Sequence, residues 1–311
     1  MDISSKIKRK AFEIGFSKIG IAKAQFYKED EFNINRWIEN GYHASMDWIE
    51  RRKEERSNIK KYYKDSKSII SVAMNYFTGN SDDYFSKHKI SNYAWGDDYH
   101  IVIKHKLHEL LNFIKDINGN INGICCVDTS PISEKVWAQR AGLGWIGKHT
   151  NLITREFGTW VFLGEIIINA ELEYDEPFVK DLCGSCTACI EACPTDAIVD
   201  EYQLDANKCI SYLTIEHRDK IPNNFSDKMN DWIYGCDICQ EVCPWNIKFS
   251  TISNESINSP GTCSLQSNFS DIDFRSVIRA KNICFYPRSL SISGHGSTCI
   301  SVRWNCELIN S

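Results

Sequence analysis

The sequence predicts a mixed α/β (α+β) fold with two domains and a tail. The chain has 311 residues, which is more than one ordinary domain needs. Strand-like and helix-like patterns alternate in its first part. An acidic stretch at 171–177 separates this part from a segment dense in cysteines, and the composition changes again after residue 250. We therefore expect domains at 1–175 and 176–250, followed by an atypical Ser- and Cys-rich tail at 251–311.

Hydrophobic spacing predicts the elements of the first domain in order. An amphipathic pattern at 4–16 indicates a helix. Apolar runs of strand length predict strands at 18–22, 68–74, 121–127 and 160–169. A longer helix follows Asp98 and ends at Asn118. Its apolar face consists of Ile103, Leu107, Leu110, Leu111 and Ile114. Another helix is expected to open at Ser130-Pro131, since Ser suits the N-cap and Pro the first helical position.

Composition and charge narrow the class of protein. With 42% hydrophobic and 25% charged residues, the chain has the composition of a soluble globular protein. No apolar run approaches the length of a membrane span and no signal-peptide pattern is found, so we expect a cytoplasmic protein with no membrane contact. The 36 basic and 41 acidic side chains lack the basic balance common in nucleic-acid binders. One basic cluster forms either a solvated helix face or a groove for nucleic-acid phosphate, and its members are Arg51, Arg52, Lys53, Arg56, Lys60 and Lys61.

The 14 cysteines carry the strongest chemical signal, because a chain without an export signal seldom uses them in disulfides. One run has the spacing of a bacterial-ferredoxin motif, in which three thiolates bind one iron–sulfur cube and the fourth binds a second. It reads Cys183-x2-Cys186-x2-Cys189-x3-Cys193-Pro194. A later run, Cys236-x2-Cys239-x3-Cys243-Pro244, repeats the end of this motif but lacks its middle cysteine. We expect Cys209 to replace that cysteine.

These cysteines supply eight thiolates, enough for two 4Fe-4S clusters. The expected ligands of one cluster are Cys183, Cys186, Cys189 and Cys243. Those of the other are Cys193, Cys209, Cys236 and Cys239. The alternative is structural zinc in four-cysteine sites. Zinc explains pairs of Cys-x2-Cys, but it explains neither the third cysteine of the first run nor the two Cys-Pro exits.

Two residues of the predicted strand at 121–127 and the residue that follows it have both a structural and a chemical interpretation. Cys125 and Cys126 are either packed strand residues, which we favour, or a redox-active pair. Asp128 is either a turn or cap residue or a catalytic acid. The residues themselves leave both alternatives open.

Two further patterns fail as motifs. His100 stands where a cobalamin-ligating Asp-x-His-x-x-Gly loop would place its ligand, but Ile103 replaces the glycine. The segment 142–148 resembles a glycine-rich phosphate loop without its Ser/Thr ending. We therefore expect a turn there, with Lys148 facing either solvent or a ligand phosphate.

Three stretches of the chain together have a recognisable pattern. They are 93–100 (YAWGDDYH), 127–131 (VDTSP) with 141–148 (AGLGWIGK), and the cysteine segments 193–198 (CPTDAI) and 234–239 (YGCDIC). Their residues and order resemble the epoxyqueuosine reductase family, which is related to the corrinoid reductive dehalogenases. The resemblance runs from the N-terminus to about Asn246.

The resemblance implies a nitroreductase-like domain with cobalamin, as cob(II)alamin, followed by a bacterial-ferredoxin-like domain with two 4Fe-4S clusters. Such enzymes reduce epoxyqueuosine to queuosine at the wobble position of tRNA, in the last step of queuosine biosynthesis. The implied partners are the tRNA anticodon loop and an external low-potential electron donor such as a ferredoxin or flavodoxin. A monomer is expected.

The resemblance also implies site residues. Asp128 matches the proton donor of the family, and we expect a dry site to raise its pKa so that it carries a proton. The residues implied to lie against cobalamin are Arg56, Ser91, Asp128, Leu152, Leu163, Ser211, Cys236 and Asp237.

Two other functions remain compatible with the sequence: a corrinoid reductase of a small molecule, and a non-enzymatic two-cluster electron carrier. The tail at 251–311 departs from the family, whose members usually continue into helical repeats and a basic segment that hold tRNA. We interpret the tail as truncated or out of frame. Its thiols, Cys263, Cys284, Cys299 and Cys306, are then incidental.

Overall fold

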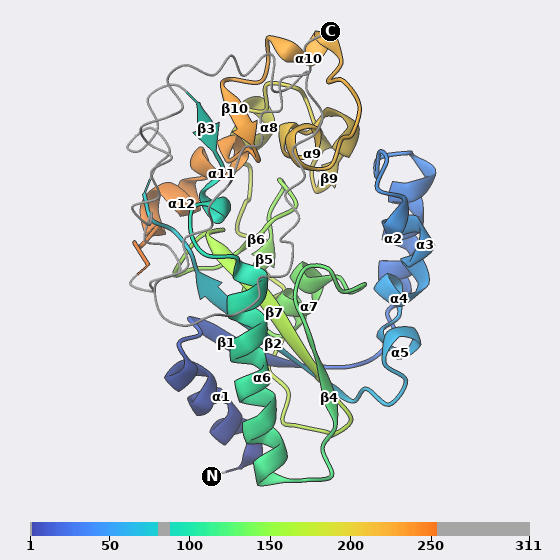
Figure 1. Cartoon of the computed structure of the whole chain (residues 1–311), viewed down its shortest axis with the longest axis vertical. Coiled ribbons are helices and arrows are strands. Elements are labelled where there is room, and N and C mark those ends of the chain that lie inside the picture. Colours follow the sequence, from blue (N-terminus) through green and yellow to red (C-terminus); the bar gives the residue numbers. More distant parts are fainter. Residues whose placement is uncertain (1, 80–87, 254–311) are drawn as a thin grey trace, which may run out of the picture.

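A computed structural model describes residues 2–79 and 88–253, so the tail and its four cysteines lie outside the described residues. The centre of the molecule is a four-stranded antiparallel sheet with the strand order β1-β2-β7-β4 (Figure 1). These strands are β1 (Lys18–Lys23), β2 (Ser68–Asn75), β7 (Val161–Ile168) and β4 (Gly123–Cys126). All four predicted strands are therefore present. Their order was not predicted.

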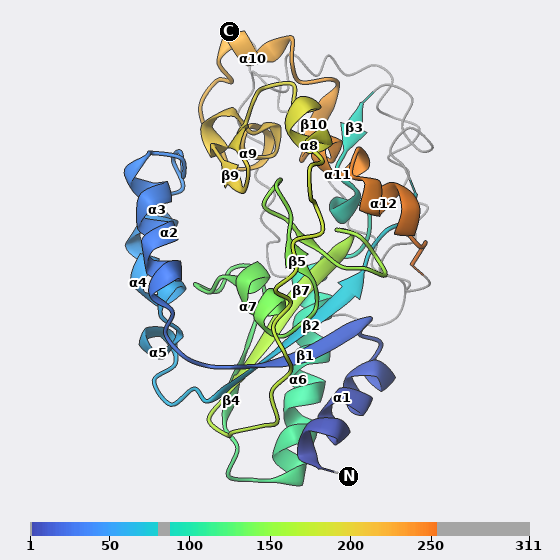
Figure 2. The ribbon, with the colours of Figure 1, turned by 180° about the vertical axis from the view of Figure 1, so that it is seen from behind.

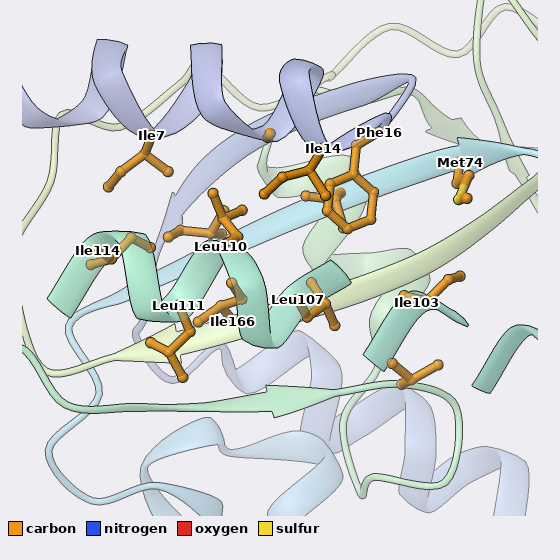
Figure 3. Packing of buried hydrophobic residues seen from close by; sticks show 14 of the residues in the cluster. Ile7, Ile14, Phe16, Met74, Ile103, Leu107, Leu110, Leu111, Ile114 and Ile166 are labelled. Carbon is orange, nitrogen blue, oxygen red and sulfur yellow. The ribbon is translucent and has the colours of Figure 1, made fainter. Parts of the chain in front are cut away.

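Two helices cover one face of the sheet, and both were expected from the periodicity of the sequence. They are α1 (Ile3–Ile14) and α6 (Tyr99–Ile117). Figure 3 shows Ile7 and Ile14 of α1 packed with Leu110 and Ile114 of α6. Side-chain caps fix where both helices begin, because Asp2 accepts a hydrogen bond from the backbone N–H of Ser5 and Asp98 accepts one from that of His100.

The opposite face of the sheet is covered by α7 (Glu134–Arg140) and by a small hairpin of β5 (Trp145–Ile146) and β6 (Leu152–Ile153). The helix predicted to open at Ser130-Pro131 begins later, at Glu134, with Ser133 at its N-cap. The prediction of this start was wrong because Ser130 and Pro131 form a turn, in which the N–H of Ile132 donates to the carbonyl of Ser130 at 2.8 Å.

Helices at one side of the molecule, visible at the edge of Figures 1 and 2, carry the basic cluster. They are α2 (Lys28–Glu39), α3 (Asp47–Arg51), α4 (Lys53–Ser57) and α5 (Ile59–Tyr62). Acidic neighbours pair with part of the cluster, since Arg52 lies 2.8 Å from Glu55 and Lys61 lies 2.8 Å from Glu54. These pairs favour the interpretation as a solvated helix face.

The cysteine segment folds into short elements above the sheet (Figure 1). They are α8 (Ala188–Glu191), β8 (Ile198–Asp200), β9 (Gln203–Leu204), η3 (Ala206–Lys208), α9 (Ile210–Ile215), α10 (Asn223–Ser226), β10 (Trp232–Tyr234), α11 (Ile238–Glu241) and α12 (Pro244–Phe249). β10 pairs in parallel with β3 (Lys89–Ile90), and the short helix η2 (Asn92–Ala94) follows β3. A segment of the first part of the chain is thus built into the second.

Side chains also connect the two parts of the molecule. Trp145 and Ile153 of the hairpin form one apolar cluster with Cys243 and Trp245. Lys148 is buried, and its ammonium donates to the carbonyl of Gly184 at 2.7 Å and pairs with a carboxylate of the same part of the chain. The expectation that Lys148 faces solvent or a ligand phosphate was therefore wrong. Within the described ranges, none of the helices has the length and apolar character needed to cross a lipid bilayer.

Candidate active site

The eight predicted cluster cysteines fall into two spatial sets in the structure, and none of them is in a disulfide. Burial, together with the neighbouring thiols of Cys183, Cys243 and Cys186, raises the pKa of Cys189 to about 11. Burial likewise raises the pKa of Cys239, whose neighbouring thiols are those of Cys236, Cys209 and Cys193. The two neighbourhoods are the same two sets that the spacing predicts.

Backbone N–H groups point at several of these sulfurs. The N–H of Ala197 donates to Cys193 Sγ at 3.2 Å. The pKa of Cys209 is raised by burial, while N–H groups of Tyr212 and Ser211 bond to its sulfur and oppose this rise. Such bonds stabilise a thiolate, which is the form that binds iron. The donor set therefore fits clusters.

The geometry is less compatible with zinc. A four-cysteine zinc site places all its sulfurs about 2.3 Å from one ion, whereas each thiolate of a cubic cluster binds a different iron atom. Among the residues that the structure describes, no group of three or more His, Cys, Asp or Glu side chains is arranged to hold a single metal ion. The described residues thus offer no site for a single zinc ion, and the spacing of the cysteines along the chain is that of cluster ligands.

Asp128 lies at a strained turn directly after β4. Its φ is +48°, in the left-handed region that a non-glycine residue seldom adopts, and the N–H of Thr129 donates to the carbonyl of Val127 across it at 2.5 Å. The backbone N–H of Asp128 donates to Glu134 Oε1. At this turn, 55% of the Asp128 side chain is exposed.

His100 holds the carboxylate of Asp128. Its Nε2 lies 3.0 Å from Asp128 Oδ2, and its Nδ1 lies 2.8 Å from Asp98 Oδ1. Tyr99 stacks on this imidazole with ring centroids 4.0 Å apart, and its own ring stacks on Phe162 at 4.5 Å. The aspartate, the histidine and the cap of α6 therefore form one fixed unit.

The expected direction of the pKa shift at Asp128 was wrong. The hydrogen bond from His100 lowers the pKa of the Asp128 carboxyl, and this effect outweighs the burial that raises it. The same hydrogen bond raises the pKa of His100, which Asp98 raises further. Both shifts favour a proton on the imidazole over one on the Asp128 carboxyl.

Two neighbours of Asp128 were not identified from the sequence. Burial and the charge of Asp128 raise the pKa of Glu134 to about 7. The ammonium of Lys135 interacts electrostatically with Asp128 and Glu134, and also with the thiols of Cys239 and Cys209. A signal was available for Glu134, since an acidic residue one position after a serine is typical of a helix start. For Lys135 the sequence holds no such signal.

Family models match two parts of the chain. Residues 56–129 match the model described as epoxyqueuosine reductase QueG, and residues 182–246 match the 4Fe-4S double cluster binding domain. The epoxyqueuosine reductase of Cellulophaga algicola is 44% identical over 257 residues, which cover 83% of this chain and 83% of that protein. That of Leadbetterella byssophila is 47% identical over 245 residues, which cover 79% of this chain and 80% of that protein. The chain belongs to the epoxyqueuosine reductase family.

Solved structures of epoxyqueuosine reductases agree with this family membership. A crystal structure of epoxyqueuosine reductase with an epoxyqueuosine-modified tRNA-Tyr stem loop matches with a TM-score of 0.74 and 33% identity, covering 83% of this chain and 69% of that one. The Bacillus subtilis epoxyqueuosine reductase, with its catalytic aspartate loop swung out of the active site, matches with a TM-score of 0.75, 32% identity and the same coverage. A catabolic reductive dehalogenase shares the fold, with a TM-score of 0.51 at 16% identity over 83% of this chain and 35% of that one. The fold class predicted from the sequence is confirmed.

The residues that the epoxyqueuosine reductase resemblance implies for cobalamin lie around this site in several environments. Arg56, at the end of α4, interacts electrostatically with Asp128 and Glu134. Ser91 and Asp237 are buried and hydrogen-bonded to each other, next to Cys236. The others are Leu152, buried against the sheet, and the half-buried Leu163 and Ser211. Their contacts to cobalamin remain predictions.

The side chains between these residues suit a flat macrocycle with polar edges. Tyr93 lies 6.2 Å from the rings of both Tyr99 and Tyr234, which gives an aromatic wall from Asp128 to the cysteine loop. Among the described residues, Arg56 Nε is a buried donor with no hydrogen-bond partner, and such a group is available to an amide or phosphate oxygen. The residues present therefore fit cobalamin.

The two cysteines of β4 lie apart from both thiol sets. Burial raises the pKa of Cys125 and of Cys126 to about 12. Thiols held neutral in this way behave as small apolar groups, so the interpretation as packed strand residues is favoured.

Proposed function

We propose that this chain reduces epoxyqueuosine to queuosine at the wobble position of tRNA, in the cytoplasm and as a monomer. The observation that carries the proposal is the position of Asp128. Its carboxylate lies beside the aromatic wall, and the ammonium of Lys135 interacts both with this carboxylate and with the thiols of Cys209 and Cys239. Membership of the family and the relative crystallised with a modified stem loop support the substrate.

Electron supply is assigned to the cysteine domain. Cys183, Cys186, Cys189 and Cys243 would hold one 4Fe-4S cluster, and Cys193, Cys209, Cys236 and Cys239 the other. An external low-potential donor such as a ferredoxin or flavodoxin would reduce them. Bound cobalamin supplies a strongly reducing cobalt centre for the substrate.

The other site residues are proposed to bind and orient cobalamin. Arg56, Ser91, Leu152, Leu163, Ser211, Cys236 and Asp237 are proposed to lie against cobalamin, together with Asp128. Asp128 is proposed to deliver a proton to the epoxide oxygen, which leaves as water. The swung-out catalytic aspartate loop of the Bacillus subtilis relative supports this role for a residue on a short loop.

The test uses the full chain, reconstituted anaerobically with iron, sulfide and cobalamin and supplied with a chemical reductant. An anticodon stem loop that carries epoxyqueuosine is expected to be converted to the queuosine form, which mass spectrometry detects as the loss of one oxygen. A stem loop without the modification serves as the control. A reconstituted protein with full iron and cobalamin contents that leaves the modified stem loop unchanged would contradict the proposal.

A further inference from the structure

The proposed reaction needs more protons than Asp128 holds. Removal of an epoxide oxygen as water, with formation of a carbon–carbon double bond, takes up two electrons and two protons. Both protons go to the same oxygen, and Asp128 is the acid beside it in the proposal. A single carboxyl group carries one proton at a time, so it must be reprotonated within each turnover.

We propose that His100 reprotonates Asp128, with Asp98 holding the imidazole in the orientation that this transfer needs. The inference rests on the proposed function and deepens it. His100 acts through Asp128 and is therefore a positioning residue for the reaction.

The geometry supports a transfer from His100 Nε2 to Asp128 Oδ2, which are 3.0 Å apart. Asp98 Oδ1 accepts from His100 Nδ1 at 2.8 Å and from the backbone N–H of the same residue at 2.9 Å. Because Asp98 is itself fixed as the N-cap of α6, the carboxylate sets both the rotamer and the tautomer of the imidazole. Stacking on Tyr99 prevents the ring from tilting away.

The charges around the pair favour a proton on the imidazole. Two carboxylates, those of Asp98 and Asp128, face His100, and both raise its pKa. The charged or titratable groups that face Asp128 come from several elements, and they are Arg56 of α4, Tyr93 of η2, Tyr99 and His100 of α6, Glu134 and Lys135 of α7, and Glu216 after α9. Of these, Tyr99 and His100 both donate to the Asp128 carboxylate. Burial raises the pKa of the Tyr99 phenol, which therefore keeps its proton, whereas the ring nitrogen of His100 can lose its proton.

The two proton transfers to the epoxide oxygen need no acid other than Asp128, His100 and water. The imidazolium of His100 gives its Nε2 proton to Asp128, which passes it to the epoxide oxygen. The neutral imidazole then takes a proton from water, which reaches it because 37% of the His100 side chain is exposed. A second transfer by the same route completes the water molecule. The two electrons come from the external low-potential donor of the proposed function.

The experiment compares the wild type with His100→Gln, because the glutamine amide can still donate to Asp128 but cannot give up a proton. We expect turnover of the modified stem loop to fall about 100-fold, in the range of a lost general acid. Iron content, cobalamin content and stem-loop affinity should not change. His108→Gln, an exposed histidine of the same helix whose ring contacts the carbonyl of Lys104, is the matched control and should keep full activity.

The pH profile and rescue separate proton transfer from a structural role. The wild-type rate should fall as the pH rises through the raised pKa of His100, and this limb should be missing in His100→Gln. Added imidazole should restore part of the rate of His100→Ala, whereas a structural defect would not respond.

The inference is overturned if His100→Gln keeps the wild-type rate and pH profile. It is also overturned if a folded His100→Ala with full iron and cobalamin contents is not rescued by imidazole. Neither result would contradict the proposed function. A wild type that does not convert the stem loop would overturn the proposed function and this role with it.

Discussion

Ser91 and Asp237, which are 146 positions apart in the chain, are joined by a hydrogen bond of 2.5 Å from Ser91 Oγ to Asp237 Oδ1. The backbone N–H of Asn92 donates to the other oxygen at 2.7 Å. Both side chains are almost completely buried, and Gly235 packs so closely on Ser91 that a Cβ there would lie 2.4 Å from the serine Cβ. This contact joins the segment before α6 to the cysteine loop.

Loss of this bond should weaken the whole fold. Ser91→Ala leaves one oxygen of a buried carboxylate with fewer donors, which costs about 1–3 kcal/mol. For a chain of this size we expect the Tm to fall by about 2–4 °C per kcal/mol, measured by anaerobic calorimetry. Ser5→Ala, which removes an exposed serine–aspartate bond, is the control and should shift the Tm much less. Equal Tm values for Ser91→Ala and the wild type would contradict this prediction.

Asp128→Asn should abolish turnover without disturbing the site. The amide can still bond to His100, but it has no proton of suitable acidity for the epoxide oxygen, so we expect the rate to fall by about 100-fold or more. Single-turnover assays with the modified stem loop measure this, together with iron and cobalamin contents that remain at the wild-type level. Asp116→Asn, an exposed aspartate of α6, serves as the control. An Asp128→Asn variant with full activity would show that the proton comes from elsewhere.

Cys209→Ala should damage one cluster and spare the other. Cys209 stands outside both cysteine motifs, yet its thiol neighbours those of Cys236 and Cys239. Iron should fall from about eight to about four atoms per chain, as expected for two cubes of four irons. Cys125→Ser, which changes a thiol apart from both sets, should keep the full iron content. An unchanged iron count in Cys209→Ala would mean that another ligand completes the second set.

Glu134 should make stability depend on pH. Its pKa is raised to about 7 in the folded protein, above the ordinary value of 4.5, because burial and Asp128 disfavour its charge. The stabilising effect of the protonated form is complete below pH 4.5 and is lost as the pH rises through about 7. We therefore expect the Tm of Glu134→Gln, relative to that of the wild type, to increase between pH 5 and pH 8 in a series of thermal melts. A difference in Tm that stays constant over this range would contradict the prediction.

The long elements of the first 170 residues follow from the sequence because their apolar faces are wide and regular. The face of α6 from Ile103 to Ile114 and the fully buried β2 are examples. The bounds of α3, α4 and α5 were not predicted, since these helices have only four or five residues each and bury little apolar surface. Elements this short depend on tertiary contacts more than on local pattern.

Part of the candidate site could likewise be predicted from the sequence, and part of it could not. The two cysteine sets follow from spacing, because a cluster imposes fixed distances on its ligands. The partners of Asp128 do not, because His100 lies 28 positions before it and reaches it through the packing of α6 on the sheet. The family resemblance therefore points to Asp128, but nothing in the local sequence points to the hydrogen bond that lowers its pKa.

The left-handed turn at Asp128 has one more consequence. A non-glycine residue in the left-handed region raises the conformational free energy of the backbone by about 1–2 kcal/mol. This increase is part of the folding free energy of the free enzyme and does not recur when RNA binds. The Asp128 carboxylate is therefore already turned toward His100 in the free enzyme, so little of the binding energy of a nucleotide is spent on ordering this turn.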